Sequence, residues 1–163
     1  MKYIVIKFKN QKHVSPLILE HFKDLGDYVL DKFFNSNLKK KLVITVIFKK
    51  NMFKDENIFG CCIWEDTHYR PKEFTIEIDP DQKLHVLMDC FAHELVHVKQ
   101  WAKGEYYQTM KNNKVYVFNK KKIDTTKVDY WDQPWEIEAH GRAIGLVVQW
   151  AQARKINEGV IQE

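Results

Sequence analysis

The chain of 163 residues lacks the features that mark secreted and membrane-embedded proteins. Its three cysteines are an odd number and include the adjacent pair Cys61 and Cys62, so they do not form a disulfide framework. No apolar run approaches the about 20 residues that a membrane-spanning helix needs. Residues 1–8 contain neither the apolar core nor the cleavage site of a signal peptide. We therefore expect a cytoplasmic protein that does not enter a membrane.

Internal repeats and low-complexity linkers are also missing, and no change in composition marks a domain boundary. Hydrophobic residues make up 45% of the chain and aromatic residues 13%, which is typical of a folded globular protein. A chain of this length can bury a core without disulfides or other staples. We predict a single domain over 1–163.

The polarity pattern predicts an α+β fold. Ser15 and Pro16 are typical of the cap and the first turn of a helix, and apolar residues at helical spacing follow them as far as Phe33. Runs of apolar, largely β-branched and aromatic residues predict strands. These runs lie at 1–8, 42–48, 58–64, 74–78 and 115–118.

The strongest functional signal is the segment His93-Glu94-Leu95-Val96-His97. Two histidines four residues apart lie on the same face of a helix, one above the other. Their ring nitrogens can bind one Zn²⁺ together, and Glu94 lies beside them, within reach of a metal-bound water. Zinc lowers the pKa of such a water toward neutrality, so a carboxylate can remove its proton as the water attacks a carbonyl.

The residues around this motif have the period of an amphipathic helix. Apolar residues recur at spacings of three and four, at positions 84, 87, 88, 91, 95, 98 and 102. His93 and His97 fall outside this stripe, on a face that also carries Asp89 and Gln100. Gly104 suits the position just after the end of a helix. The pattern therefore predicts a helix whose histidines point away from the core.

A second segment downstream offers a third ligand. A catalytic zinc usually has three protein ligands and one open position. Pro134 suits the first turn of a helix, and Glu136, Glu138 and His140 follow on it. The helix dipole favours acidic residues in these turns even without a metal, so the two carboxylates alone do not establish a site.

Together, His93-Glu94-x-x-His97 and Glu136-x-x-Ala139-His140 resemble the gluzincins, zinc metallopeptidases whose third ligand is a glutamate on a second helix. The resemblance covers these two helices. It implies a small zincin-like domain with a mixed or antiparallel sheet, an active-site helix and a C-terminal ligand helix. It also implies one Zn²⁺ per chain, held by His93, His97 and Glu136, with Glu94 as the general base. Glu138 is the fallback ligand.

His140 departs from the gluzincin pattern. In thermolysin an aspartate that hydrogen-bonds a ligand histidine follows the ligand glutamate by four residues, and this chain has His140 there. The ImmA/IrrE-like peptidases have a similar Glu-x-(Glu/Gln)-Ala-Asn pattern, which again points to Glu136. The SprT-like peptidases use a third histidine instead, so a site made of His93, His97 and His140 is the main structural alternative.

The sequence leaves the group that stabilises the oxyanion open. Such sites usually supply a histidine, tyrosine or arginine donor that faces the metal. The candidates, for this role or for support of a ligand, are His140, Arg142 and Tyr130, and further donors are Tyr106, Tyr107 and His68.

Two segments are candidates for the walls of a cleft. In zincins the sheet edge just ahead of the active-site helix binds an extended peptide, and the strand with Glu73 and Glu77 on its polar face is a candidate for it. The same pattern fits a solvated edge strand whose charges prevent aggregation. The polar segment 105–133 is either a substrate-facing flap or a lysine-rich loop.

The net charge of +4 raises the question whether the protein binds nucleic acid. SprT-like proteases, for example, act on proteins that are bound to DNA. Lysines cluster at 39–41, 49–50 and 120–122, but they are spread over the chain without an arginine-and-aromatic binding motif. Solvated faces explain such clusters, so we do not expect a nucleic-acid partner.

We therefore predict a zinc-dependent metallopeptidase that acts on a peptide or protein substrate, and nothing in the sequence indicates its oligomeric state. The alternatives are a zinc hydrolase of a non-peptide amide, a DNA-associated SprT-like protease and a catalytically silent zinc-binding interaction module. Glu94 argues against the silent module, because a purely structural zinc site does not need a general base and is usually closed by four cysteine or histidine ligands.

Overall fold

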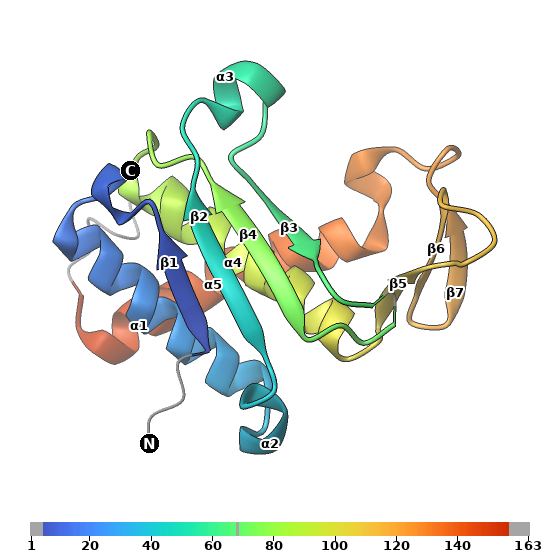
Figure 1. Cartoon of the computed structure of the whole chain (residues 1–163), viewed down its shortest axis with the longest axis horizontal. Coiled ribbons are helices and arrows are strands. Elements are labelled where there is room, and N and C mark those ends of the chain that lie inside the picture. Colours follow the sequence, from blue (N-terminus) through green and yellow to red (C-terminus); the bar gives the residue numbers. More distant parts are fainter. Residues whose placement is uncertain (1–4, 68, 157–163) are drawn as a thin grey trace.

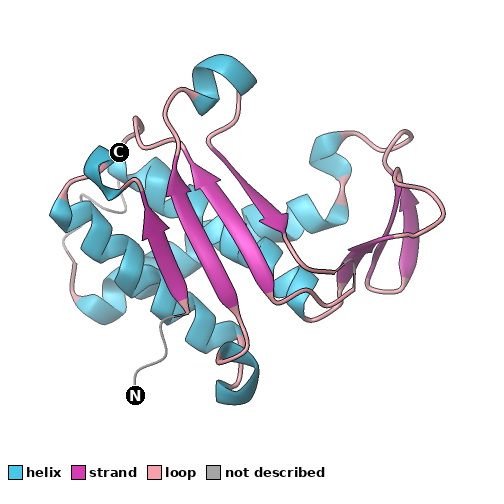
Figure 2. Ribbon diagram, viewed as in Figure 1, coloured by secondary structure: helices cyan, strands magenta, loops and turns pink. Residues whose placement is uncertain are grey.

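The computed structural model describes residues 5–67 and 69–156 (Figures 1 and 2). The described residues fold as an α+β structure with a mixed four-stranded sheet and an antiparallel three-stranded sheet, in agreement with the predicted class. The elements are, in chain order, β1 (Ile6–Lys9), η1 (Gln11–His13), α1 (Pro16–Phe33), α2 (Ser36–Lys39), β2 (Val43–Phe48), α3 (Met52–Glu56), β3 (Gly60–Trp64), β4 (Glu73–Ile78), α4 (Leu84–Ala102), β5 (Tyr106–Gln108), β6 (Val115–Phe118), β7 (Lys121–Asp124), η2 (Tyr130–Asp132) and α5 (Pro134–Arg154).

Strand order in the larger sheet is β1-β2-β4-β3. β1 and β4 pair with β2 in parallel, whereas β3 pairs with β4 antiparallel. The prediction that residues 73–78 form a sheet edge was wrong, because β4 is an inner strand and the two edge strands are β1 and β3. The alternation itself is confirmed, since Phe74, Ile76 and Ile78 are all buried. Such an alternation reports that one face is covered and carries no information about which strand is outermost.

The long helices α1, α4 and α5 cover one face of this sheet, and α4 packs against both other helices as well as β3 and β4 (Figure 1). Most of the apolar stripe of α4 is buried, as predicted. The opposite face does not point to solvent, however, because α5 lies on it. His97 is only 8% exposed and Gln100 is completely buried. The histidines therefore lie at the interface of two helices.

The sequence signals for helix ends were partly right. The Ser15 side chain accepts a hydrogen bond from the backbone N–H of Ile18 at the start of α1, as expected for a cap. Gly104 has a φ of 72° and ends α4. Asp79, Pro80 and Asp81 are also residues that favour the start of a helix, but α4 begins later, at Leu84. The Asp79 carboxylate instead accepts hydrogen bonds from the backbone of residues 53 and 81.

Between the two long helices, the predicted strand at 115–118 is confirmed as β6, the central strand of the small sheet. An aromatic cluster attaches this sheet to the helices. The Tyr106 ring stacks on Trp135 with ring centroids 4.5 Å apart, and it packs on Trp101 at 4.3 Å. Trp135 belongs to the first turn of α5, so the small sheet fixes the place where that helix begins.

No helix in the part of the chain that the structure describes is both long and apolar enough to span a membrane.

Gly60 at the start of β3 is required by the close approach of that strand to α4. A Cβ atom at this position would lie 2.6 Å from Cys90 Sγ and 2.9 Å from the backbone carbonyl oxygen of Glu77. We expect Gly60→Ala to lower the free energy of unfolding by about 1–3 kcal/mol, because the added methyl overpacks this contact. The matched control is Gly145→Ala in α5, where a Cβ meets nothing within 4 Å. It should raise stability by about 0.5–1 kcal/mol. Urea unfolding of the two variants checks both signs, and equal effects would contradict the assigned contact.

Candidate metal centre

The candidate centre lies where α4 and α5 pack against each other. The helix α4 carries His93, Glu94 and His97, and the first turns of α5 carry Glu136 and His140. Pro134 occupies the first turn of α5, as the sequence predicted. The buried side chain of Trp135 holds that turn against the aromatic cluster. Glu136 follows directly and turns its carboxylate toward α4.

Two histidines and one glutamate converge on a single point. His93 Nε2 lies 3.3 Å from Glu136 Oε2, His97 Nε2 lies 3.4 Å from Glu136 Oε1, and the two Nε2 atoms are 3.0 Å apart. Ligand atoms about 2.0–2.1 Å from a tetrahedral zinc lie about 3.3 Å from one another. The three separations therefore match the spacing of ligands around one zinc ion.

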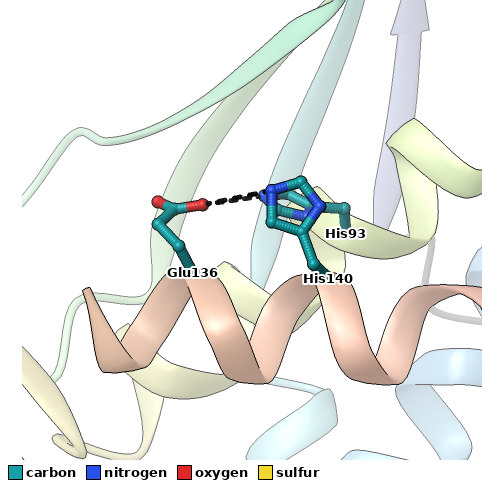
Figure 3. Close-up of side chains that lie close together, drawn as sticks. All are labelled: His93, Glu136 and His140. Atoms are coloured by element: carbon teal, nitrogen blue, oxygen red, sulfur yellow. Dashed lines mark ion pairs between the residues drawn. The ribbon is translucent and has the colours of Figure 1, made fainter. Parts of the chain in front are cut away.

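His140 also approaches this point. One ligand atom each of His93, Glu136 and His140 lies within 4.8 Å of the other two, and Figure 3 shows Glu136 and His140 rising from the same helix toward His93. His140 Nε2 is 4.0 Å from Glu136 Oε2, farther than the Nε2 atom of His93 or His97 is from this carboxylate, and its side chain is 45% exposed. We therefore assign His140 to the mouth of the centre and the more buried His97 to the centre itself.

Hydrogen bonds fix the orientation of His97. The Gln100 side-chain amide donates from Nε2 to the Trp135 carbonyl oxygen and to Glu138 Oε2, both at 2.9 Å. Both partners are acceptors, so the amide oxygen must face His97, whose Nδ1 lies 2.8 Å away. His97 Nδ1 then carries the proton. His97 Nε2 lies 3.4 Å from Glu136 Oε1, and once it gives up its own proton its lone pair faces the point shared with that carboxylate, as a metal ligand requires.

Glu138, the fallback ligand, is occupied elsewhere. Its carboxylate pairs with Lys99 at 2.7 Å and with Arg142 at 2.8 Å, and it accepts the bond from Gln100. Burial raises the pKa of Glu138, but the bonds from Lys99 and Gln100 outweigh burial and hold it below the usual value. Glu138 thus supports the orientation of His97 through Gln100, and Glu136 is the carboxylate that faces the histidines.

We expect Gln100→Leu to weaken zinc binding by about 10- to 100-fold, the range found when an outer partner of a ligand histidine is removed. Leucine keeps the volume but leaves His97 Nδ1 without its acceptor, so the ring no longer has one preferred tautomer. Competition against a chromophoric chelator measures the affinity. Gln152→Leu on the exposed face of α5 is the matched control and should bind zinc like the wild type. Unchanged affinity in Gln100→Leu would remove the orienting role from this amide.

Glu94 lies beside the converging atoms and is 5% exposed. Burial raises the pKa of its carboxyl to about 7, helped by the negative charge of Glu136 and opposed by His97. A carboxyl with a pKa near neutrality exchanges protons readily at physiological pH, as a general base requires.

Tyr130, from η2, joins the centre through Glu136. Its hydroxyl donates a 2.7 Å hydrogen bond to Glu136 Oε2. Burial raises the pKa of Glu136, but hydrogen bonds from His93, His97 and Tyr130 outweigh burial and keep the carboxyl ionised. The centre therefore contains a permanent negative charge that can offset the charge of a cation.

The other predicted donors lie elsewhere or are engaged. Arg142 donates to Glu138 and lies outside the pocket beside the centre. Tyr106 is buried in the aromatic cluster, and Tyr107 packs its ring against Tyr69. His68 falls outside the described residues. Of the donors named from the sequence, only His140 and Tyr130 line the pocket.

A pocket of about 690 Å³ opens beside the centre. Several of its residues had no signal in the sequence, because they come from a loop far from both motifs and from exposed apolar positions of η2 and α5. The lining residues are Asn57, Ile58, Phe59, Gly60, Val86, Asp89, Cys90, His93, Glu94, Tyr130, Trp131, His140, Ala143 and Ile144.

Two histidines and a glutamate, with a buried acid and a pocket beside them, define a candidate metal centre in an α+β fold. No protein family, curated protein or solved structure matches the chain.

Proposed function

We propose that the protein is a zinc-dependent metallopeptidase. The observation that carries the proposal is the convergence of His93, His97 and Glu136 at separations that suit one zinc ion, with Glu94 beside them. His93, His97 and Glu136 hold the metal in this proposal. A three-ligand set leaves a fourth position open, which favours a catalytic over a structural centre.

Bound zinc would polarise a substrate carbonyl and acidify a water in the open position. Glu94 takes the proton of the attacking water and then delivers it to the leaving amine. Its burial serves this role, because a carboxylate held away from solvent is a stronger base than an exposed one. His140 lines the pocket and is the donor that would stabilise negative charge on the carbonyl oxygen, whereas the single hydroxyl proton of Tyr130 is given to Glu136.

The edge strand β3 provides a place for the substrate backbone. Its first residue, Gly60, is so close to α4 that a Cβ there would lie 3.5 Å from Glu94 Oε1. A peptide added to the outer edge of β3 as a further strand would therefore pass beside the general base. The peptide-binding role predicted for β4 thus passes to its antiparallel neighbour β3.

Two measurements on the purified protein test the function. We expect about one zinc per chain by atomic emission, and hydrolysis of a mixed peptide library by mass spectrometry. A chelator should abolish hydrolysis, and added zinc should restore it. Zinc binding without hydrolysis of any peptide would favour the silent binding module or a hydrolase of another amide.

The cluster of His93, Glu136 and His140 supports a second ligand set, in which His140 replaces His97. The exposure of His140 and the support of His97 by Gln100 make this the less favoured assignment. The variants described in the Discussion separate the two sets.

A further inference from the structure

The pocket beside the centre combines polar and apolar side chains. His93, Glu94 and His140 come from the candidate centre, Asn57, Asp89 and Tyr130 are further polar residues, and the remaining walls are largely apolar. These walls come from three separate places in the chain: the loop before β3, the first half of α4, and the segment from η2 into α5. Their apolar members are Ile58, Phe59, Val86, Trp131, Ala143 and Ile144.

Several of these apolar side chains are exposed although the chain has a large buried core. Trp131 is 67% exposed and Ile144 is 61% exposed. Phe59 stacks on Phe53 with ring centroids 4.7 Å apart, and both rings remain partly exposed. Exposed apolar residues that gather around one concave site mark a binding surface more often than scattered ones do.

We propose that this pocket is the specificity pocket of the enzyme and takes a bulky apolar side chain, aromatic or branched aliphatic, from the residue next to the scissile bond. The inference rests on the proposed peptidase function and names its substrate class. The reason is that the proposed general base Glu94 and the apolar walls line one and the same pocket. A side chain held against these walls brings its own backbone close to Glu94.

The size of the pocket agrees with this occupant. Its volume of about 690 Å³ exceeds that of a single side chain, so the ring and the flanking backbone fit together. Asp89 is a carboxylate in the lining, and a lysine side chain paired with it is the competing occupant. The apolar walls disfavour that occupant, because a charge moved from water to such a surface loses hydration.

Three blocked pentapeptides that differ only in a central Phe, Lys or Gly test the proposal. Calorimetry on the Glu94→Gln protein measures their affinities without turnover. We expect the Phe peptide to bind about tenfold or more tightly than the Gly peptide, because its ring leaves water for an apolar wall. Equal affinities for Phe and Gly, preference for Lys, or binding of none of the three would overturn the proposal.

A matched pair of variants on α5 locates the effect. Ile144→Asp places a charge in the wall and should reduce the affinity for the Phe peptide about tenfold, with the Gly peptide unaffected. Ile137→Asp alters a residue of the same helix that is 56% exposed but does not line the pocket, and it should change neither affinity. Equal effects of the two variants would show that Ile144 does not form the wall that binds the Phe side chain.

Hydrolysis by the wild-type protein separates this inference from the function on which it rests. Phe-selective binding without hydrolysis of the Phe peptide would keep the pocket and overturn the peptidase. Hydrolysis of all three peptides at equal kcat/KM would keep the peptidase and overturn the pocket.

Discussion

Replacing Glu94 with glutamine is expected to lower kcat for peptide hydrolysis by about 10²- to 10⁴-fold, the contribution of a positioned general base. Glutamine has nearly the same shape, so packing in this buried position is preserved. The amide cannot accept a proton from water at neutral pH. Zinc binding should persist, because Glu94 is not among the proposed ligands. Single-turnover hydrolysis of a good peptide substrate and zinc content by atomic emission provide the two readouts.

The control for this variant is Glu20→Gln, which makes the same chemical change at an exposed position of α1. It should leave both kcat and zinc content unchanged. If Glu94→Gln retained wild-type kcat, another residue would be the base. If it lost zinc, Glu94 would belong to the ligand set.

The second large effect is expected from Glu136→Ala. Loss of a residue that only hydrogen-bonds a metal ligand weakens metal binding by up to about 100-fold, and loss of the proposed ligand Glu136 should weaken zinc binding by more than this. Among the described residues, Glu136 is the only carboxylate that pairs with both His93 and His97, and the variant removes it. Glu138→Ala is the matched control two residues along the same helix. It should weaken zinc binding by no more than about 100-fold, because Glu138 contacts His97 only through Gln100. Chelator competition measures all affinities, and circular dichroism verifies that each variant is folded.

His140→Ala completes this series. We expect it to keep zinc and to lower kcat, as suits a donor at the mouth of the pocket. Loss of zinc in His140→Ala, with retention in His97→Ala, would assign the metal to His93, Glu136 and His140 instead.

Local patterns in the sequence predicted much of the structure, because each reports a local preference of the chain. The cap at Ser15, the proline at the start of α5 and the left-handed Gly104 all occupy the expected positions. The two motifs also come together in space as expected. His93 and Glu136 are far apart in the sequence, and the α4–α5 packing brings their ligand atoms to 3.3 Å.

The features that sequence analysis missed depend on long-range partners. The pattern of alternation in β4 is the same for an inner strand and for an edge strand with one covered face, so the edge was assigned to the wrong strand. Gln100 fell on the histidine face of the predicted helix, but its role depends on Trp135 and Glu138 from α5. Likewise, Ile144 gains its place in the pocket only when the loop before β3 lies opposite.

Trp135 links three parts of the molecule that are separate in the sequence. Its ring stacks on Tyr106 in the small sheet, its carbonyl accepts the bond from Gln100, and its chain neighbour is Glu136. In the proposed metal centre the small sheet would therefore be coupled to metal affinity, even though none of its strands supplies a proposed ligand. We expect that the small sheet cannot be replaced by another sequence without loss of the centre. Loosening its contact with Trp135 would free both the proposed ligand Glu136 and the Gln100 side chain that orients His97.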